Sequence, residues 1–243
     1  MSGVTDIVMR RIASRLGASF VVSEMVASDV YVAGQDEARI RAEGTGLDCH
    51  IVQLAGRDPS WMAEAAKVAE ASGAHVIDIN MGCPAKRVTG GYAGSALMRD
   101  LDLASRLIDS VRNAFNGPVS VKMRLGWDDT QRNAVDLARR AEALGVSWIT
   151  VHGRTRCQFY KGKADWNAIG DVARAVKLPV IANGDCTSLD DARTILAHSH
   201  AVGVMIGRAA LGQPWLVGQI ARALAGATNI TIDAACRQAV VNE

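Results

Sequence analysis

The feature that most constrains the fold of this chain is a regular alternation of short apolar runs with longer amphipathic segments. Seven runs rich in Val and Ile are each followed by a segment with the length and spacing of a helix. Such an alternation, joined by short loops, is typical of parallel strands connected by right-handed helical crossovers. The strands are expected at residues 18–24, 50–54, 76–80, 119–123, 148–152, 180–183 and 202–206. The helices are expected at residues 7–16, 36–43, 59–71, 102–115, 131–144, 165–176, 190–198 and 214–224.

Chain length and strand number together favour an α/β fold of the (β/α)8 TIM-barrel class. The 243 residues are close to the roughly 250 of a typical barrel of this kind. Seven strands do not close such a barrel, so we expect an eighth, first strand that ends at Met1 and is truncated in this chain. We assign residues 1–225 to the barrel and residues 226–243 to the start of a C-terminal helical domain that is largely absent. A ragged chain end is the alternative for the last segment.

The composition excludes several other classes of protein. With 49% hydrophobic residues the chain is globular and not disordered. The five Cys are scattered, form no C-x-x-C or zinc spacing and are odd in number, so we expect no disulfide framework, no metal and a reducing cytoplasm. No run approaches the ~18 apolar residues of a membrane span, and no signal peptide is recognisable. The net charge of +2 alone predicts neither nucleic-acid nor membrane binding. We expect the protein to be a monomer.

The stretch at residues 76–84, V-I-D-I-N-M-G-C-P, ends a buried strand with a thiol. Gly82 and Pro84 break the strand, and Pro84 restricts Cys83 to an extended or turn conformation. Cys83 is therefore expected just past the strand end, beside the side-chain amide of Asn80, where a parallel barrel carries its chemistry. Burial is the usual role of a free Cys and Asn is a common turn former, so this stretch alone also fits a purely structural interpretation.

Every predicted strand is followed by polar side chains or by glycines of the kind found in phosphate-binding loops. A barrel of this class places its active site at this end of the strands. A single strand-end Lys is explained equally well as a solvated rim charge. So many such residues together are difficult to explain by stability alone. They are Ser2, Glu24, Gln53, Asn80, Cys83, Lys122, Arg124, His152, Arg154, Asn183, Gly184, Asp185, Gly207 and Arg208.

The loops after the last two strands, at residues 183–185 and 207–208, predict a phosphate site. Their glycines let backbone N–H groups approach phosphate oxygens, and Arg208 supplies a charged fork. Glycines that only make tight turns are the alternative. Lys122, whose stem rises inside the barrel, is expected to face an anion such as a reduced flavin. Gln53 would then contact the flavin edge, and His152 would contact phosphate or ring unless it is a satisfied core His.

Five motifs taken together resemble those of the flavin-dependent tRNA-dihydrouridine synthases, and most of all the bacterial B-type branch. They are D-I-N-M-G-C-P-A-K, V-K-M-R-L-G, V-H-G-R-T-R, I-A-N-G-D and M-I-G-R-A-A, and the matching positions extend from Met1 to about Leu216. The resemblance implies a (β/α)8 barrel that binds FMN, followed by a helical domain that helps to hold tRNA. It also implies the reaction, which reduces specific uridines in tRNA to 5,6-dihydrouridine with NADPH (or NADH) as electron donor.

The resemblance further implies roles for individual residues. Cys83 matches the family's proton donor and Asn80 a residue near the substrate uracil, and we add Arg124 and Arg154 as substrate-binding candidates. Of the Ala-Pro-Met-like turn that ends the family's first strand, only Met1 is present. The positions that match the FMN site are Met1, Ser2, Gln53, Lys122, His152, Asn183, Gly184, Asp185, Gly207 and Arg208.

The implied chemistry suits these residue types. FMN would deliver hydride to C6 of uracil, and the developing enolate would then take a proton at C5. A Cys thiol is mostly protonated at neutral pH, so Cys83 is suited to act as general acid from the opposite face of the ring. The target base has to leave its stack, and folded RNA is held mainly by phosphate contacts and shape. Loop cations at the same end are expected to form a basic rim of Lys86, Arg87, Arg154, Arg156, Lys161 and Lys163.

Two other functions stay open at this point. A dihydroorotate dehydrogenase-like flavoenzyme that acts on a free pyrimidine would share the barrel, the FMN and the strand-end Lys. The basic rim argues weakly against it. A flavin- or RNA-binding protein without catalysis would have no use for a proton donor at Cys83.

Overall fold

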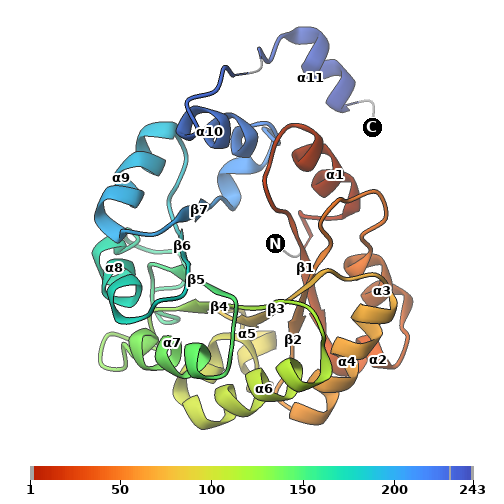
Figure 1. Ribbon diagram of the computed structural model, residues 1–243, viewed down its shortest axis with the longest axis vertical. Coiled ribbons are helices and arrows are strands. Elements are labelled where there is room, and N and C mark those ends of the chain that lie inside the picture. The colour runs from red at the N-terminus through yellow and green to blue at the C-terminus, as the bar shows by residue number, and fades with distance from the viewer. Residues whose placement is uncertain (1–2, 230, 242–243) are drawn as a thin grey trace.

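The computed structural model describes residues 3–229 and 231–241, and its seven strands form one parallel sheet. Each strand pairs with the next along the chain, and the sheet curls into the inner wall of a ring that the helices surround (Figure 1). This is the architecture of the (β/α)8 barrel class that the alternation predicts. The strands are β1 (Val22–Ala27), β2 (Ile51–Ala55), β3 (Val76–Met81), β4 (Val119–Arg124), β5 (Trp148–His152), β6 (Val180–Asn183) and β7 (Gly203–Met205).

The helices begin and end within a few residues of the predicted positions, and one of them shows why. Asp58 accepts hydrogen bonds from the N–H groups of Ser60 and Trp61, and Pro59 occupies the first helical position. The longer helices are α1 (Ile7–Arg15), α3 (Asp36–Ala42), α4 (Pro59–Ala71), α6 (Leu101–Ala114), α7 (Ala134–Ala143), α8 (Trp166–Ala175), α9 (Leu189–Ser199), α10 (Leu216–Leu224) and α11 (Ala234–Val241). Shorter turns of helix are α2 (Ser28–Val32), α5 (Lys86–Thr89), η1 (Gly94–Arg99) and η2 (Arg208–Ala210).

The first described strand lies further along the chain than the sequence pattern predicts. Residues 18–24 were expected as a strand, but β1 runs from Val22 to Ala27 and α2 follows it directly. The misleading signal is Phe20, which is 61% exposed and stacks on the ring of Trp148, the first residue of β5. Glu24 consequently lies within β1 and not at its end, and its carboxylate accepts a hydrogen bond from the N–H of Gly3.

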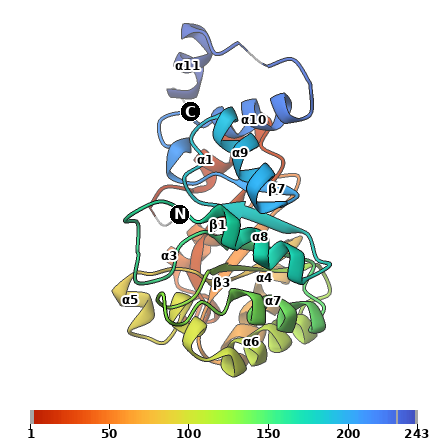
Figure 2. The same cartoon turned by 90° about the vertical axis from the view of Figure 1, so that its left-hand side faces the viewer.

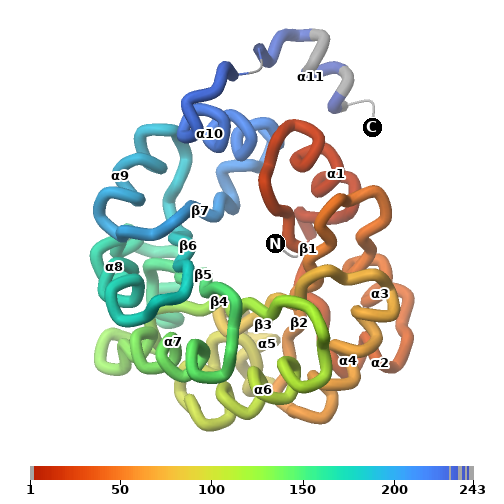
Figure 3. The backbone as a smooth tube through the Cα atoms, viewed as in Figure 1, coloured from red at the N-terminus to blue at the C-terminus, as the bar shows by residue number. Residues whose placement is uncertain are grey.

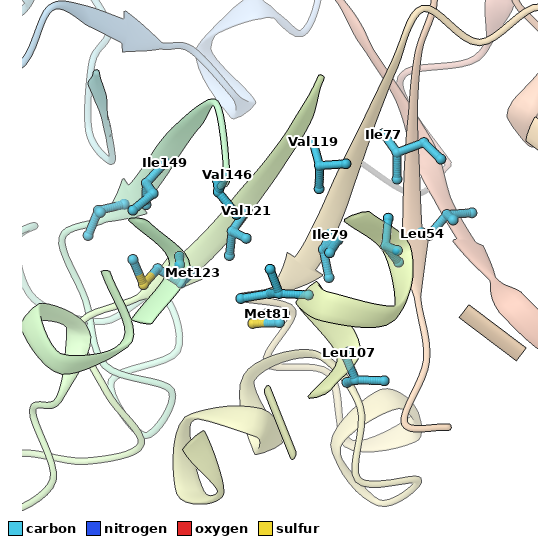
Figure 4. Close-up of a cluster of buried hydrophobic side chains, with 14 of the residues drawn as sticks. Leu54, Ile77, Ile79, Met81, Leu107, Val119, Val121, Met123, Val146 and Ile149 are labelled. Carbon is cyan, nitrogen blue, oxygen red and sulfur yellow. The ribbon is translucent and has the colours of Figure 1, made fainter. Parts of the chain in front are cut away.

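The two faces of the strands differ in polarity. Alternate residues of β3 and β4 point outward and pack against the helices, and Figure 4 shows them in one apolar cluster with Leu107 of α6. Since side chains alternate along a strand, the residues between them face the interior of the barrel. On β3 and β4 these inner residues include Asp78, Asn80, Ser120 and Lys122, so these two strands have an apolar outer face and a largely polar inner face.

The helix layer spans the gap between the first and last described strands. In Figures 1 and 3, α10 and α1 lie side by side there, between β7 and β1. Gly218 of α10 lies against the carbonyl of Leu16, where a Cβ atom would come within 1.9 Å of the oxygen. Arg222 donates a hydrogen bond to the same carbonyl at 3.1 Å. Only glycine permits this close approach at position 218.

The last described helix projects beyond the ring. Figure 2 shows α11 above α10, and the guanidinium of Arg237 lies 5.7 Å from the centroid of the Trp215 ring. The division into a barrel at 1–225 and a further segment at 226–243 stays a prediction. The strand expected to end at Met1 lies outside the described residues. Within residues 3–229 and 231–241, no helix combines the length and the apolar character needed to cross a membrane.

Candidate active site in the barrel mouth

The predicted site residues of neighbouring strands lie at common levels of the inner wall. The register pairs Asn80 with Lys122, and nearer the carboxyl ends it pairs Arg124 with His152 and His152 with Asn183. Paired residues of parallel strands face the same side of the sheet. Strands β3 to β6 therefore bring their polar side chains together at the carboxyl end of the barrel.

A chain of buried hydrogen bonds leads from the interior to the Cys83 loop. The Nε2 of Gln53 donates to Oδ2 of Asp78 at 2.7 Å, and its Oε1 accepts from Nδ2 of Asn80 at 2.8 Å. The Oδ1 of Asn80 accepts from the backbone N–H groups of Gly82 at 3.2 Å and Cys83 at 2.9 Å. Asn80 thus acts as the turn former at the strand end, and it fixes the backbone that carries the thiol.

Further hydrogen bonds hold the same loop from two other sides. The carbonyl of Cys83 accepts from the N–H of Ser95 at 3.0 Å and from its hydroxyl at 2.8 Å. Gly94, at φ +60°, approaches that carbonyl so closely that a Cβ atom would lie 2.8 Å from it. The Nε of Arg124, which is 1% exposed, donates to the carbonyl of Gly82 at 2.8 Å. The side chain of Cys83 is partly exposed at the end of this fixed segment.

Lys122 enters the mouth as a partly unsatisfied cation. Its Nζ donates to Oδ1 of Asn183 at 3.1 Å, and Nδ2 of Asn183 donates to the carbonyl of Met205 at 2.8 Å. An ammonium group has three N–H donors, so this single bond leaves donors for another acceptor. Burial lowers the pKa of Lys122 from 10.5 to about 8, against the opposing effect of the Asp78 carboxylate. Because burial disfavours the charged form of this side chain, an anion bound beside it would stabilise that form.

The environment of His152 confirms that the mouth is positive. Burial, together with the neighbouring cations Lys122, Arg124, Arg154 and Arg208, lowers the pKa of His152 to about 2. The ring is therefore neutral at physiological pH. Its Nε2 lies 3.3 Å from Nη1 of Arg154, so this nitrogen is the acceptor and Nδ1 carries the proton.

Arg154 and Asp185 form the main ion pair of the mouth. Arg154 is 2% exposed, and its two Nη atoms reach the two carboxylate oxygens of Asp185 at 2.9 and 2.7 Å. The guanidinium also donates to the carbonyls of Lys161 and Gly162, and Asp185 accepts from the N–H of Ala164 at 2.8 Å. Burial acts to raise the pKa of Asp185, but the hydrogen bonds from Arg154 and Ala164 outweigh it and lower the pKa.

The predicted phosphate loops lie beside this pair, and the side chain of Arg208 in the second loop is exposed to solvent. Arg208 is exposed, its guanidinium lies 4.8 Å from the centroid of the Tyr160 ring, and it is 3.8 Å from Asp185. Gly184 has φ +120°, and a Cβ atom there would lie 3.0 Å from the His152 ring. Gly207 directly precedes η2. The glycine at 184 is therefore required by the close approach of its backbone to His152.

The structure places the remaining predicted residues as follows. Arg124 and Arg154 lie in the mouth, but their guanidinium groups are buried and bound to protein carbonyl and carboxylate oxygens. Direct contact of these two side chains with a substrate stays a prediction that their present partners do not favour. Met1 and Ser2, which we expected at the cofactor, lie outside the described residues.

The cations of the expected rim differ in exposure. Lys86, Arg87, Lys161 and Lys163 are exposed, Arg156 is half-buried, and Arg154 is buried and so does not belong to the outer surface. Aromatic rings that the sequence analysis did not select lie among them. Arg99 and Arg156 lie 4.8 and 4.7 Å from the centroid of the Trp127 ring. The exposed rings of this rim belong to Tyr92, Phe159 and Tyr160.

Asp78 is the site residue that the sequence analysis missed. It interrupts the apolar run V-I-D-I-N, at the same spacing that puts Asn80 on the inner wall. A single Asp in a buried strand was available as a signal, since a buried carboxylate needs partners. Its partners Gln53 and Ser120 come from different strands, and this pairing becomes visible only in the register of the sheet.

The residues of the mouth fit an anionic cofactor. Lys122 retains unused donors, Arg208 is exposed, and His152 is kept neutral by burial and by its cationic neighbours. At Gly184 the backbone of the loop after β6 comes so close to His152 that only glycine fits. A flavin nucleotide, which carries a phosphate and gains negative charge on reduction, matches this set of donors.

Comparison with known proteins identifies relatives of the whole chain. A family model described as "Dihydrouridine synthase (Dus)" matches residues 1–241. A protein of Rhizobium leguminosarum bv. phaseoli, named "Probable tRNA-dihydrouridine synthase", is 55% identical over 223 residues, which cover 92% of this chain and 70% of the relative. The "tRNA-dihydrouridine synthase B" of Pseudomonas aeruginosa is 46% identical over 221 residues, which cover 90% of this chain and 67% of the relative.

Solved structures with low sequence identity share the fold. Histamine dehydrogenase from Rhizobium sp. 4-9 matches with a TM-score of 0.63 at 14% identity, over 91% of this chain and 44% of that chain. A mandelate oxidase matches with a TM-score of 0.56 at 20% identity, over 97% of this chain and 64% of that chain. These matches support the barrel architecture and nothing more specific.

Proposed function

The chain belongs to the dihydrouridine synthase family, and on that premise we propose that it reduces specific uridines in tRNA to 5,6-dihydrouridine with electrons from NADPH. The relatives that carry this activity in their names are up to 55% identical over more than nine-tenths of the chain. The enzyme is an oxidoreductase that adds a hydride to C6 and a proton to C5 of the uracil ring. The polar, positively charged barrel mouth supports a charged cofactor and a nucleic-acid substrate at one place.

FMN is the cofactor that we propose for this mouth. When bound there, it would supply the hydride for C6 of uracil, after its own reduction by NADPH. Lys122 would direct its unused N–H donors to the anionic edge of the flavin ring, and Gln53 and His152 would contact the ring from β2 and β5. The hydrogen bond between Lys122 and Asn183 would then connect the flavin-binding side chain to the first phosphate loop.

The phosphate of FMN is assigned to the loops after β6 and β7. Backbone N–H groups at Gly184, Asp185 and Gly207 and the guanidinium of Arg208 are the proposed donors. The side chain of Asp185 is occupied by Arg154, so its proposed role is to hold Arg154 and Arg208 in place. Met1 and Ser2 remain proposed contacts of the same cofactor.

The observation that carries the proposed chemistry is the fixed position of Cys83. Three sets of hydrogen bonds hold its loop, from Asn80, Ser95 and Arg124, while the side chain stays partly exposed in the mouth. We assign Cys83 as the general acid that protonates C5, because a positioned thiol beside the substrate ring meets the geometric demand of proton transfer.

The other substrate contacts follow from the same frame. Asn80 is proposed to lie against the uracil while its amide holds the turn, and Arg124 and Arg154 are proposed to shape the pocket by fixing its loops. The exposed cations Lys86, Arg87, Lys161 and Lys163 are proposed to contact tRNA phosphates. We assign residues 1–225 to the catalytic barrel and residues 226–243 to the start of a helical segment that adds to tRNA binding.

Nucleoside analysis of cellular tRNA tests the proposed function. Deletion of the gene should abolish dihydrouridine at one or more tRNA positions, and expression of the full chain should restore it, whereas the Cys83→Ala variant should not. The purified protein should show flavin absorption. Unchanged dihydrouridine after deletion, together with oxidation of free dihydroorotate by the purified protein, would assign the barrel to a free pyrimidine instead.

A further inference from the structure

One carboxylate lies beneath the Cys83 loop with no part in the chemistry described so far. Asp78 is 2% exposed and lies on the inner face of β3, two residues before Asn80 and five before Cys83. Its Oδ1 accepts from the Ser120 hydroxyl at 2.6 Å and its Oδ2 accepts from Nε2 of Gln53 at 2.7 Å. Burying a carboxylate is costly even when it is hydrogen-bonded, and an apolar side chain at such a place is often at least as stable.

The carboxylate determines the direction of every hydrogen bond between it and Cys83. Both carboxylate oxygens of Asp78 accept, one from Ser120 and one from Gln53, so Gln53 turns its NH2 group toward Asp78 and its oxygen toward Asn80. Asn80 then has to present its NH2 group to Gln53, which leaves its oxygen for the N–H groups of Gly82 and Cys83. If either amide were rotated, two acceptors or two donors would face each other inside the barrel.

We propose that Asp78 is a positioning residue for proton transfer: acting through Gln53 and Asn80, it fixes the backbone of Cys83 and with it the direction of the thiol. The inference rests on the function proposed above for the role of that thiol. The effect of Asp78 on the loop does not depend on that function, because it acts through the hydrogen bonds of Gln53 and Asn80.

The two hydrogen bonds of Asp78, one from Gln53 and one from Ser120, are its two arms, and they provide a matched control. The arm through Gln53 leads to Cys83, whereas the arm to Ser120 ends on β4. Asp78→Leu breaks both arms, and Ser120→Ala breaks only the arm that does not lead to Cys83. Asp78→Asn can still accept from Gln53 through Oδ1 and donate to Ser120, whose hydroxyl rotates to accept, so it preserves the direction of the chain.

Amide hydrogen exchange of the full chain tests the placement without reference to turnover. In Asp78→Leu the N–H groups of Gly82 and Cys83 should exchange faster than in the parent, because their acceptor on Asn80 is no longer held. Asp78→Asn and Ser120→Ala should exchange like the parent. Parent-like exchange in Asp78→Leu would overturn the proposal whether or not the protein acts on tRNA. If Asp78→Leu does not fold, Asp78→Ser, which is too short to reach Gln53, replaces it.

A double-mutant cycle tests the link to chemistry. With saturating FMN, Asp78→Leu should slow dihydrouridine formation about 10²-fold with little change in the KM for tRNA, since small misplacements of a reacting group have effects of this size. The Asp78→Leu/Cys83→Ala variant should be no slower than Cys83→Ala alone, because the lost positioning then serves no thiol. Multiplicative losses would show that Asp78 acts elsewhere and overturn the proposal. A parent that forms no dihydrouridine would refute the proposed function, and the exchange measurement would still decide the role of Asp78.

Discussion

The two walls of the barrel mouth are built on opposite principles. On the wall formed by β2 and β3, the polar groups that carry Cys83 are bound to one another, from Asp78 through Gln53 to Asn80. On the wall formed by β4 to β7, Lys122 donates one hydrogen bond to Asn183 and keeps unused donors, and Arg208 is exposed. The first wall is complete within the chain, and the second is arranged to receive a ligand. We infer from this difference that the first wall holds the catalytic loop in place and that the second wall binds the cofactor.

The largest effect on the rate of dihydrouridine formation is expected from substitution of Cys83, at the end of the wall formed by β2 and β3. Cys83→Ala should lower the rate of dihydrouridine formation by about 10²- to 10⁴-fold, because the reaction loses its general acid. Cys83→Ser should also be slow, since a hydroxyl is a far weaker acid than a thiol. Reduction of bound FMN by NADPH should stay at the parent rate in both variants, because the thiol takes no part in it. A parent-like rate of dihydrouridine formation in Cys83→Ala would show that the frame serves another purpose.

Loss of the ion pair behind the receiving wall should mainly affect stability. Arg154→Met leaves the Asp185 carboxylate and two carbonyls without their partner, and should lower the free energy of unfolding by about 3 kcal/mol. Urea denaturation of the two proteins measures the difference. The matched control is Glu64→Gln, which removes an exposed ion pair with Lys67 and should cost no more than about 0.5 kcal/mol. Equal effects of the two substitutions would contradict the structural role of Arg154.

Substitution of Arg208, the exposed cation after β7, should affect cofactor binding more than folding. Arg208→Ala should weaken FMN binding by about tenfold or more, as expected for the loss of one charge-assisted hydrogen bond to phosphate. Flavin fluorescence titration gives the dissociation constant, and the melting temperature without FMN should remain near that of the parent. Riboflavin, which has no phosphate, serves as the control ligand and should bind parent and variant equally. Parent-like FMN affinity in Arg208→Ala would remove the phosphate from this loop.

The smallest effect is a pH dependence of cofactor binding. The pKa of Lys122 is lowered to about 8 by burial, so the side chain is charged below that pH and neutral above it. FMN affinity of the parent should therefore fall as the pH rises through about 8, and Lys122→Met should lack this step. The groups around Lys122 are Asp78, Cys83, Arg124 and His152, and of these His152, with its pKa lowered to about 2, stays neutral across the range. Titrations of both proteins between pH 7 and 9.5 with FMN decide the matter.

The contrast between the walls also shows what the sequence could reveal. The strands β5 and β6 and the helix α4 have the predicted bounds, because Gly and Pro mark their ends and their patterns are regular. The start of β1 was misplaced because the apolar signal of Phe20 belongs to a surface contact. Sequence spacing placed Cys83, Lys122 and Arg208 at or near strand ends, where the structure has them, since a strand end is a local property. Their roles stay predictions.

Interactions between strands were the part that could not be predicted. Arg124 is bound by carbonyls of the loop after β5, and Arg154 by Asp185 in the loop after β6, whereas we had expected these side chains to face a substrate. The role of Asp78 likewise depends on the register of β2 against β3, because only that register brings Gln53 next to it. A residue's position along the chain shows which wall it belongs to, and its partners across strands determine whether it is free to bind a ligand.

The central claim is that this mouth transfers electrons from a bound flavin to uracil in tRNA. The most direct test is anaerobic mixing of the full chain, reduced by one equivalent of NADPH, with tRNA that lacks dihydrouridine. We predict that the spectrum of oxidised flavin returns and that one dihydrouridine forms for each flavin reoxidised, whereas fully modified tRNA leaves the flavin reduced. A flavin that stays reduced with both tRNAs, or that reoxidises without forming dihydrouridine, would contradict the account.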